Sequence, residues 1–135
     1  TKYQQGKDIS ADERQAFAWY KAAADQGLSA AQLNVGRMLA DGLGTKKDES
    51  LARQYFEKAA SRGDNRASFN LAMMEEQKKN YMGAYQWYEL STRDGMLDTK
   101  VISLSEGKKT ALAANLTQDQ IRTARDRADK WIQAQ

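Results

Sequence analysis

Small and aromatic residues recur along the chain at the spacing of one face of an α-helix. The stripe in the first such segment consists of Ala16, Trp19, Tyr20 and Ala23, which follow one another at i, i+3, i+4 and i+7. Large rings beside alanines allow a neighbouring helix to approach closely while the rings fill the gaps. The pattern predicts an amphipathic helix that packs against other helices.

The same pattern occurs three times, which indicates internal repeats. Each copy closes on a glycine, and these glycines are Gly27, Gly63 and Gly95, at spacings of 36 and 32 residues. The same two offsets relate three residues that are suited to cap a helix N-terminus, namely Asp12, Asp48 and Asn80. Because caps, aromatics and glycines agree at one pair of offsets, we interpret the repeat as real.

Each repeat is predicted to be a helical hairpin. Its second helix begins at the capping residue and ends at the glycine, which can take the left-handed conformation there. The first helices of two hairpins are expected near Ala31–Asp41 and Ala67–Lys78. Burying each large apolar side chain is worth about 1.5–3 kcal/mol, and only an adjacent repeat can cover it. The predicted fold class is therefore all-α, a short right-handed α-α superhelix, or solenoid, of helical hairpins with a C-terminal capping helix.

The repeats define an expected organisation for one solenoid domain that spans residues 1–135. It comprises repeats at about 1–28, 29–64 and 65–95, a degenerate half-repeat at 96–107, and a capping helix at 117–134. Thr117 and Gln120 form a capping box at the start of that helix, and residues 107–115 are expected to join it to the repeats.

The beginning of the chain aligns with the end of a first helix, because Tyr3-x-x-Gly6 corresponds to Leu39-x-x-Gly42. We therefore expect the chain to be a piece of a longer protein. We also expect the helix from Asp12 to show an apolar flank.

These residues together resemble the Sel-one-like repeat (SLR) family, a subtype of the tetratricopeptide-like α-solenoids. The positions that carry the resemblance in the second repeat are Ala31, Val35, Gly36, Leu39, Gly42, Gly44, Asp48, Ala52, Tyr55, Phe56, Ala59, Ala60 and Gly63. The resemblance covers about residues 1–107, and it departs in the third repeat, where Ser91 and Thr92 replace two alanines. It implies an adaptor or scaffold that binds another protein or a peptide.

The amino-acid composition excludes several kinds of catalytic and metal-binding site. The chain has no His and no Cys, which excludes Cys–His and Ser–His–Asp catalysis, thiolate or imidazole metal sites, and disulfides. Lys and Arg exceed Asp and Glu by 21 to 18, a surplus too small to indicate a nucleic-acid partner. No apolar stretch is long enough to span a membrane. We therefore expect no cofactor, no metal, no transmembrane segment and no enzymatic activity.

Two short motifs resemble catalytic or phosphate-binding signatures only in part. Ser105-x-x-Lys108 fits one element of penicillin-recognising serine enzymes, but the accompanying elements are absent. Gly42-x-Gly44-x-x-Lys47 lacks the strand and the ending of a phosphate loop, and the repeat explains its glycines as turn residues. Beta-lactam hydrolysis, which is associated with cysteine-rich members of the family, stays a weaker alternative.

The first helices of stacked hairpins generally line a concave groove, and their outward positions are the candidate partner-binding residues. These candidates are Leu33, Asn34, Arg37, Asp41, Phe69, Asn70, Met73 and Gln77. Asn34 and Asn70 occupy the same repeat position, and an amide can both donate to and accept from a peptide backbone. The alternatives are that both asparagines lie on an ordinary polar face, and that Phe69 and Met73 belong to the core.

Paired lysines precede two of the capping residues and form a candidate basic edge. They are Lys46, Lys47, Lys78 and Lys79, and Lys108-Lys109 follows further along. Such an edge is suited to an acidic partner, nucleic acid or lipid head groups; the alternative is that these lysines only keep the surface solvated. The lack of cysteine suits an oxidising compartment, and we favour an exported, periplasmic bacterial location over the cytoplasm.

Overall fold

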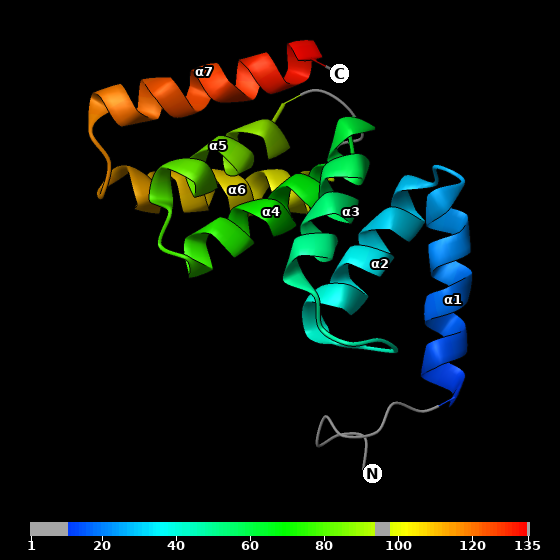
Figure 1. The fold of residues 1–135 in the computed structure, drawn as a ribbon. Helices are drawn as coiled ribbons and strands as arrows, with labels where there is room; N and C mark the ends of the chain where they lie inside the picture. Colours follow the sequence, from blue (N-terminus) through cyan, green and yellow to red (C-terminus); the bar gives the residue numbers. More distant parts are fainter. Residues whose placement is uncertain (1–10, 94–97, 135) are drawn as a thin grey trace. The chain divides into compact units, whose positions relative to one another are not determined.

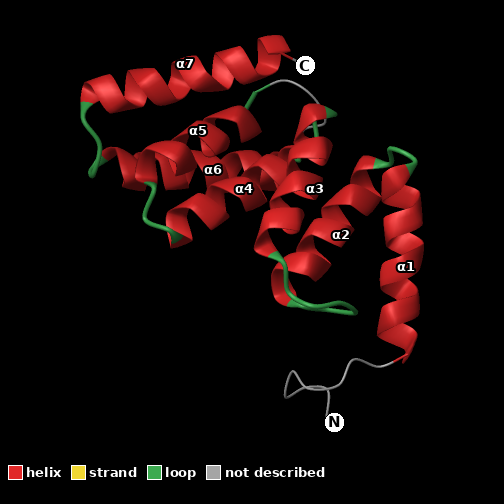
Figure 2. Ribbon diagram, in the orientation of Figure 1, coloured by secondary structure: helices red, strands yellow, loops and turns green. Residues whose placement is uncertain are grey.

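The computed structural model describes residues 11–93 and 98–134, and every regular element within these ranges is an α-helix (Figures 1 and 2). The helices are α1 (Ala11–Asp25), α2 (Ser29–Asp41), α3 (Glu49–Ser61), α4 (Asn65–Gln77), α5 (Tyr81–Ser91), α6 (Thr99–Ala113) and α7 (Gln118–Ala134). The all-α prediction is confirmed, and α2 and α4 each begin two residues before the expected start.

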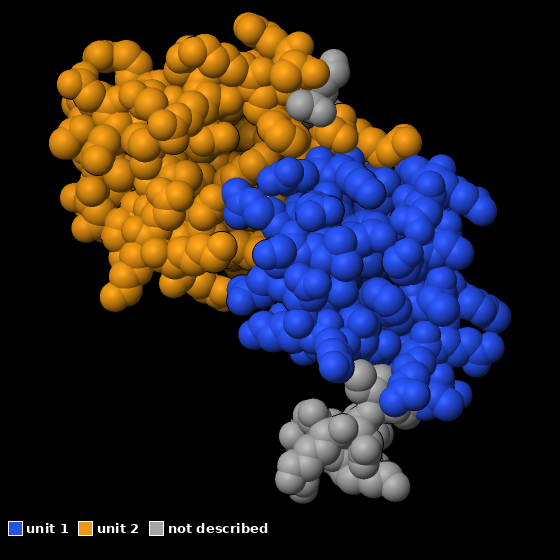
Figure 3. All heavy atoms as spheres, viewed as in Figure 1, with its two compact units in different colours: residues 1–59 blue, residues 60–135 orange. Residues whose placement is uncertain are grey.

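The chain divides into two compact units, Thr1–Ala59 and Ala60–Gln135 (Figure 3). Unit 1 contains α1, α2 and α3 except for the last two residues of α3, and unit 2 contains α4 to α7. The stacking of all repeats into one domain over residues 1–135 stays a prediction.

The capping residues expected from the sequence begin two of the helices. Asp48 Oδ1 accepts a hydrogen bond of 3.0 Å from the backbone N–H of Leu51 at the start of α3. Asn80 Oδ1 accepts one of 3.1 Å from Gly83 at the start of α5. Asp12 differs, because α1 already includes Ala11 and the Asp12 carboxylate lies in its first turn. There it interacts favourably with the helix dipole.

The closing glycines take the expected left-handed conformation. Gly27 has φ 96° and Gly63 has φ 87°, and each lies two residues after the end of its helix, α1 or α3. The expected equivalent at Gly95, like the alignment at Tyr3 and Gly6, lies outside the described residues. The shorter turn between α4 and α5 has no glycine, and Lys79 takes φ 63° there. That conformation is strained for a residue with a side chain.

In unit 1, α1 packs against α2, and Gly36 of α2 lies against the ring of Phe56 of α3. Phe56 is 1% exposed, and a Cβ atom added to Gly36 would lie 2.6 Å from its ring. Only glycine therefore lets α2 lie this close to the Phe56 ring. Tyr55, on the same helix, donates a 3.1 Å hydrogen bond to the Asp25 carboxylate of α1.

Helix α5 is the centre of unit 2, because it contacts α4, α6 and α7. Tyr88 is fully buried, and its ring meets Phe69 of α4 edge-on at 5.4 Å between centroids. Trp87 meets Trp131 of α7 in the same manner at 5.0 Å. These aromatic pairs join three of the four helices of the unit.

The helix expected at residues 117–134 is present as α7, whereas α6 extends further than expected. Thr117 and Gln120 form the expected capping box, with reciprocal hydrogen bonds of 2.9 and 3.1 Å between backbone N–H groups and side-chain oxygens. The segment 107–113, which was expected to be a connection, is helical, because α6 continues to Ala113. α6 and α7 thus follow one another as two helices, and the assignment of residues 96–107 to a degenerate half-repeat stays a prediction.

Candidate functional site

The outward face of α2 carries three of the four residues expected there. Asn34 is half-buried, and Arg37 and Asp41 are exposed, so the three follow one another at i, i+3 and i+7 on one face. Leu33 is 1% exposed and belongs to the core of unit 1, so its assignment to the groove is wrong. The outward face of α2 is therefore narrower than expected and does not include position 33.

The outward face of α4 repeats this arrangement in unit 2. Asn70 and Met73 are half-buried, and Gln77 is exposed. Asn70 Nδ2 donates a 2.8 Å hydrogen bond to the carbonyl oxygen of Arg66, one turn earlier. Phe69 is half-buried and its ring meets Tyr88 edge-on, so the groove and the core interpretations both stay open for it.

Six of the eight groove candidates form two short stripes, one on α2 and one on α4. We call Asn34, Arg37 and Asp41 the α2 stripe, and Asn70, Met73 and Gln77 the α4 stripe. The members of each stripe lie on one helix. The two stripes belong to different units and occupy equivalent positions of two repeats.

The four lysines of the basic edge are all exposed and lie in turns. Lys46 and Lys47 lie between α2 and α3, and Lys78 and Lys79 between α4 and α5. The expected continuation of the edge through Lys109 is wrong, because the side chain of Lys109 is only 11% exposed and pairs with two carboxylates of unit 2.

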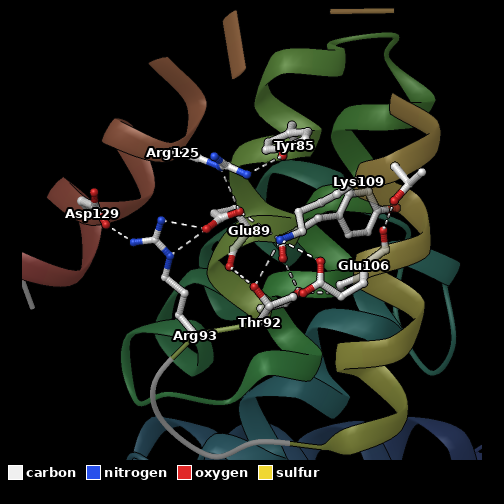
Figure 4. A network of polar contacts seen from close by, with 12 residues as sticks. Tyr85, Glu89, Thr92, Arg93, Glu106, Lys109, Arg125 and Asp129 are labelled. Carbon is white, nitrogen blue, oxygen red and sulfur yellow. Dashed lines mark hydrogen bonds and ion pairs between the residues drawn. The ribbon is translucent and has the colours of Figure 1, made fainter. Parts of the chain in front are cut away.

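Those pairs belong to a charged network that joins α5, α6 and α7 around Glu89 (Figure 4). The Glu89 carboxylate is 12% exposed and accepts hydrogen bonds of 3.0 Å from Lys109 and 2.8 Å from Arg93. Arg125 of α7 lies 3.7 Å from it, and Arg93 also pairs with Asp129 of α7. One buried carboxylate therefore connects side chains from three helices.

The network fixes the ionisation of its buried members. Burial opposes the charge of Glu89, but hydrogen bonds from Lys109 and Arg93 outweigh it and lower the pKa of Glu89 below its ordinary value. Burial likewise opposes the charge of Lys109, and its bonds to Glu89 and Glu106 raise the pKa of Lys109 in spite of it. Both groups are charged at neutral pH, which is what a structural ion pair requires.

A second polar contact lies next to this network. The Tyr88 hydroxyl donates a 2.7 Å hydrogen bond to Glu76, and burial together with this bond raises the pKa of Tyr88. Lys108 lies 3.8 Å from the same carboxylate, which links α4 and α6. The sequence signal for these contacts is weak, since only the Glu89–Arg93 pair has the i, i+4 spacing of a helical ion pair.

The described residues offer surfaces for binding. Within residues 11–93 and 98–134, no group of three or more Asp and Glu side chains is placed to hold a metal ion. No helix in the described part of the chain combines the length and apolar character needed to cross a membrane. The charged network pairs its own members, whereas the two stripes and the turns with Lys46, Lys47, Lys78 and Lys79 are the predicted features that present polar side chains outward.

Comparison with known proteins agrees with this architecture. The Sel1 repeat matches residues 3–28, 29–64 and 65–96. A chitin synthase regulator, SKT5, of Malassezia restricta is 39% identical over 59 residues, which cover 44% of this chain and 4% of that protein. A protective antigen of uropathogenic Escherichia coli that displays an SLR fold superimposes with a TM-score of 0.79 at 26% identity. That match covers 97% of this chain and 28% of the antigen.

The matches confirm the predicted repeats and fold class. The chain spans small parts of both relatives, and these come from Malassezia restricta and Escherichia coli, so the expected bacterial origin stays a prediction. Repeats of this kind form protein–protein interaction modules and are typically not enzymes. The chain belongs to the Sel1 repeat family.

Proposed function

We propose that the chain binds a peptide or protein partner through the outward faces of its first helices, the α2 stripe and the α4 stripe. The observation that carries the proposal is the recurrence of one arrangement. An asparagine heads each stripe at the same repeat position, and the residues three and seven positions later are partly or fully exposed.

The chemistry of the stripes suits recognition of a peptide backbone. A side-chain amide offers two N–H donors and a carbonyl acceptor, and Asn70 commits one donor to the Arg66 carbonyl of its own helix. It keeps a donor and the acceptor for a partner. Arg37 and Asp41 add one charge of each sign to the α2 stripe, and Met73 adds an adaptable apolar contact to the α4 stripe.

A capture experiment with matched variants tests this proposal. The groove variant is the triple change Asn34→Ala, Arg37→Ala and Asn70→Ala. The control variant changes three exposed residues of α7, Arg127→Ala, Lys130→Ala and Gln133→Ala. Proteins captured from source-cell extract are quantified by mass spectrometry, after circular dichroism has confirmed equal helicity.

We expect a partner that the wild type and the control hold and that the groove variant loses. A partner retained equally by all three proteins contradicts the proposal. The second candidate binding site is then the pair of turns that carry the four exposed lysines of the basic edge. For that candidate, binding of an acidic partner, nucleic acid or lipid head groups falls steeply with salt and is lost when Lys46, Lys47, Lys78 and Lys79 are neutralised.

We infer further that the chain is not an enzyme. The beta-lactam alternative rests on relatives with a cysteine pair in each repeat, and this chain has no cysteine. Turnover of nitrocefin, a chromogenic beta-lactam, would overturn this inference.

A further inference from the structure

Four residues on one side of α1 form a surface whose counterparts on α3 and α5 are buried. We call them the α1 stripe, and they are Ala16, Trp19, Tyr20 and Ala23. The repeat offsets relate them to Ala52, Tyr55, Phe56 and Ala59 of α3, and to Ala84, Trp87, Tyr88 and Ser91 of α5. Every one of these counterparts is at most 5% exposed, whereas Trp19 is 71% exposed.

The first helix of the same repeat contacts the aromatic ring in both counterparts. On α3, the ring of Phe56 lies against Gly36 of α2. On α5, the ring of Tyr88 meets Phe69 of α4 edge-on, and its hydroxyl donates a 2.7 Å hydrogen bond to Glu76 of α4. In both repeats, therefore, a neighbouring helix covers the side chain at the position of Tyr20.

Helix α2 packs on a different face of α1. Ala24 of α1 is 2% exposed, and its carbonyl oxygen accepts a 3.2 Å hydrogen bond from Gln32 of α2. Ala24 lies five positions after Trp19 and hence about 140° around the helix from it. Within unit 1, α2 lies between α1 and α3 and leaves the α1 stripe exposed (Figure 1).

The contact between α4 and α5 shows which helix suits the α1 stripe. Tyr20 has a hydroxyl group like Tyr88, whereas the counterpart on α3 is a phenylalanine. On α4, the residue that meets the ring and the residue that accepts from the hydroxyl are Phe69 and Glu76. They are seven positions apart, so they lie on one face of their helix. The alanines beside Trp19 let a helix approach closely, as in the buried counterparts.

We propose that the α1 stripe binds an amphipathic helix of a partner protein in the manner in which α5 binds α4. An apolar side chain of that helix packs on the ring of Tyr20. A Glu seven positions later accepts a hydrogen bond from the Tyr20 hydroxyl, and the helix covers Trp19. This inference goes beyond the proposed function, since it uses a surface apart from the α2 and α4 stripes.

A helical peptide with the sequence of α4, residues 65–77, is the probe. A hydrocarbon staple through positions 70 and 77 keeps it helical and leaves Phe69 and Glu76 unchanged. Binding to the whole chain is measured by isothermal titration calorimetry. The variants are Trp19→Ala, Tyr20→Ala and Tyr20→Phe, and the control is Leu104→Ala, at another exposed large apolar residue. Circular dichroism checks that all keep the helicity of the wild type.

We expect the wild type and the control to bind the peptide equally. Trp19→Ala and Tyr20→Ala should each weaken binding at least about tenfold, because they remove large apolar contacts from the interface. Tyr20→Phe should cost less. Changing Glu76→Ala in the peptide should weaken binding to the wild type and have no further effect on Tyr20→Phe, because both changes remove the same hydrogen bond.

Absence of peptide binding overturns the inference, as does equal binding by Trp19→Ala and the wild type. Analytical ultracentrifugation without peptide tests the other occupant, a second copy of the chain. A wild-type dimer that becomes a monomer in Trp19→Ala would show that the stripe pairs with itself and would likewise overturn the inference. The groove variant of the capture experiment should bind the peptide normally, so the two proposals fail independently.

Discussion

Helices α1 and α5 carry the same aromatic stripe at equivalent positions of two repeats, yet one stripe is exposed and the other buried. Trp19 and Tyr20 of α1 are 71% and 42% exposed, whereas Trp87 and Tyr88 of α5 are 5% and 0% exposed. The expected apolar flank on α1 is thereby confirmed. The stripe specifies a face that other helices can cover, and α5 has three helices packed around it. In a repeat protein the interface between neighbours supplies the stability.

The charged residues differ in the same way. Lys21 and Asp25 of α1 occupy the positions of Glu89 of α5 and Arg93 just after α5, and each couple forms an i, i+4 ion pair. The α1 couple is about half exposed, so solvent screens the attraction between its charges. The α5 couple also holds side chains of α6 and α7, so its loss affects three helices.

The largest expected effect separates the two tryptophans. Trp87→Ala should lower the free energy of unfolding by about 3–5 kcal/mol, because it leaves a cavity against Trp131. Trp19→Ala should change it by less than about 0.5 kcal/mol, since that side chain is mostly in solvent. Urea denaturation followed by circular dichroism measures both changes. Equal losses of unfolding free energy would contradict the difference described between α1 and α5.

The next effect concerns the charged network. Glu89→Gln should destabilise the protein by about 2–3 kcal/mol at neutral pH, because Lys109 stays buried with less compensation. The folded-state pKa of Glu89 lies below its ordinary value of 4.5. The carboxylate thus contributes its stability fully above that pH and loses it as the pH falls through the folded-state pKa.

The variant should accordingly lose less stability than the wild type between neutral and acidic pH, measured by urea denaturation at a series of pH values. Lys130→Gln on α7, which removes an exposed i, i+4 partner of Asp126, is the control and should leave the pH profile unchanged. Parallel profiles for Glu89→Gln and the wild type would show that the network does not stabilise unit 2.

The smallest expected effect tests whether unit 1 is tightly packed at Gly36, even though the aromatic side chains of α1 are exposed. Gly36→Ala should destabilise by about 1–3 kcal/mol, because the new methyl group would overlap the Phe56 ring. Gly107→Ala on α6 meets no atom within 4 Å and should stabilise by about 1 kcal/mol through helix propensity. Opposite shifts in urea midpoint are expected, and shifts of the same sign would contradict the packing described.

Local features of the fold could be predicted from the sequence, because caps and closing glycines act within a few residues. Asp48, Asn80 and the Thr117–Gln120 box all behave as expected. The extent of α6 was missed because Gly107 weakens a helical pattern without ending the helix. The burial of Leu33 was missed because the outward face was taken too wide: position 33 lies about 100° around the helix from Asn34 and faces the core.

Contacts between helices could not be predicted in this way. The network around Glu89 brings together Lys109 and Arg125, which lie 20 and 36 residues further along the chain. Their meeting depends on how α6 and α7 pack on α5, and no local spacing encodes it. The candidate stripes followed from the repeat alone, because equivalent positions on α2 and α4 face outward in both units.

Hydrogen exchange with and without the captured partner tests the central claim most directly. The account predicts slower amide exchange on binding in residues 29–41 and 65–77, which contain the α2 and α4 stripes, and no change in residues 118–134 of α7. Slower exchange confined to α7, or to the lysine turns at residues 42–48 and 78–80, would contradict it.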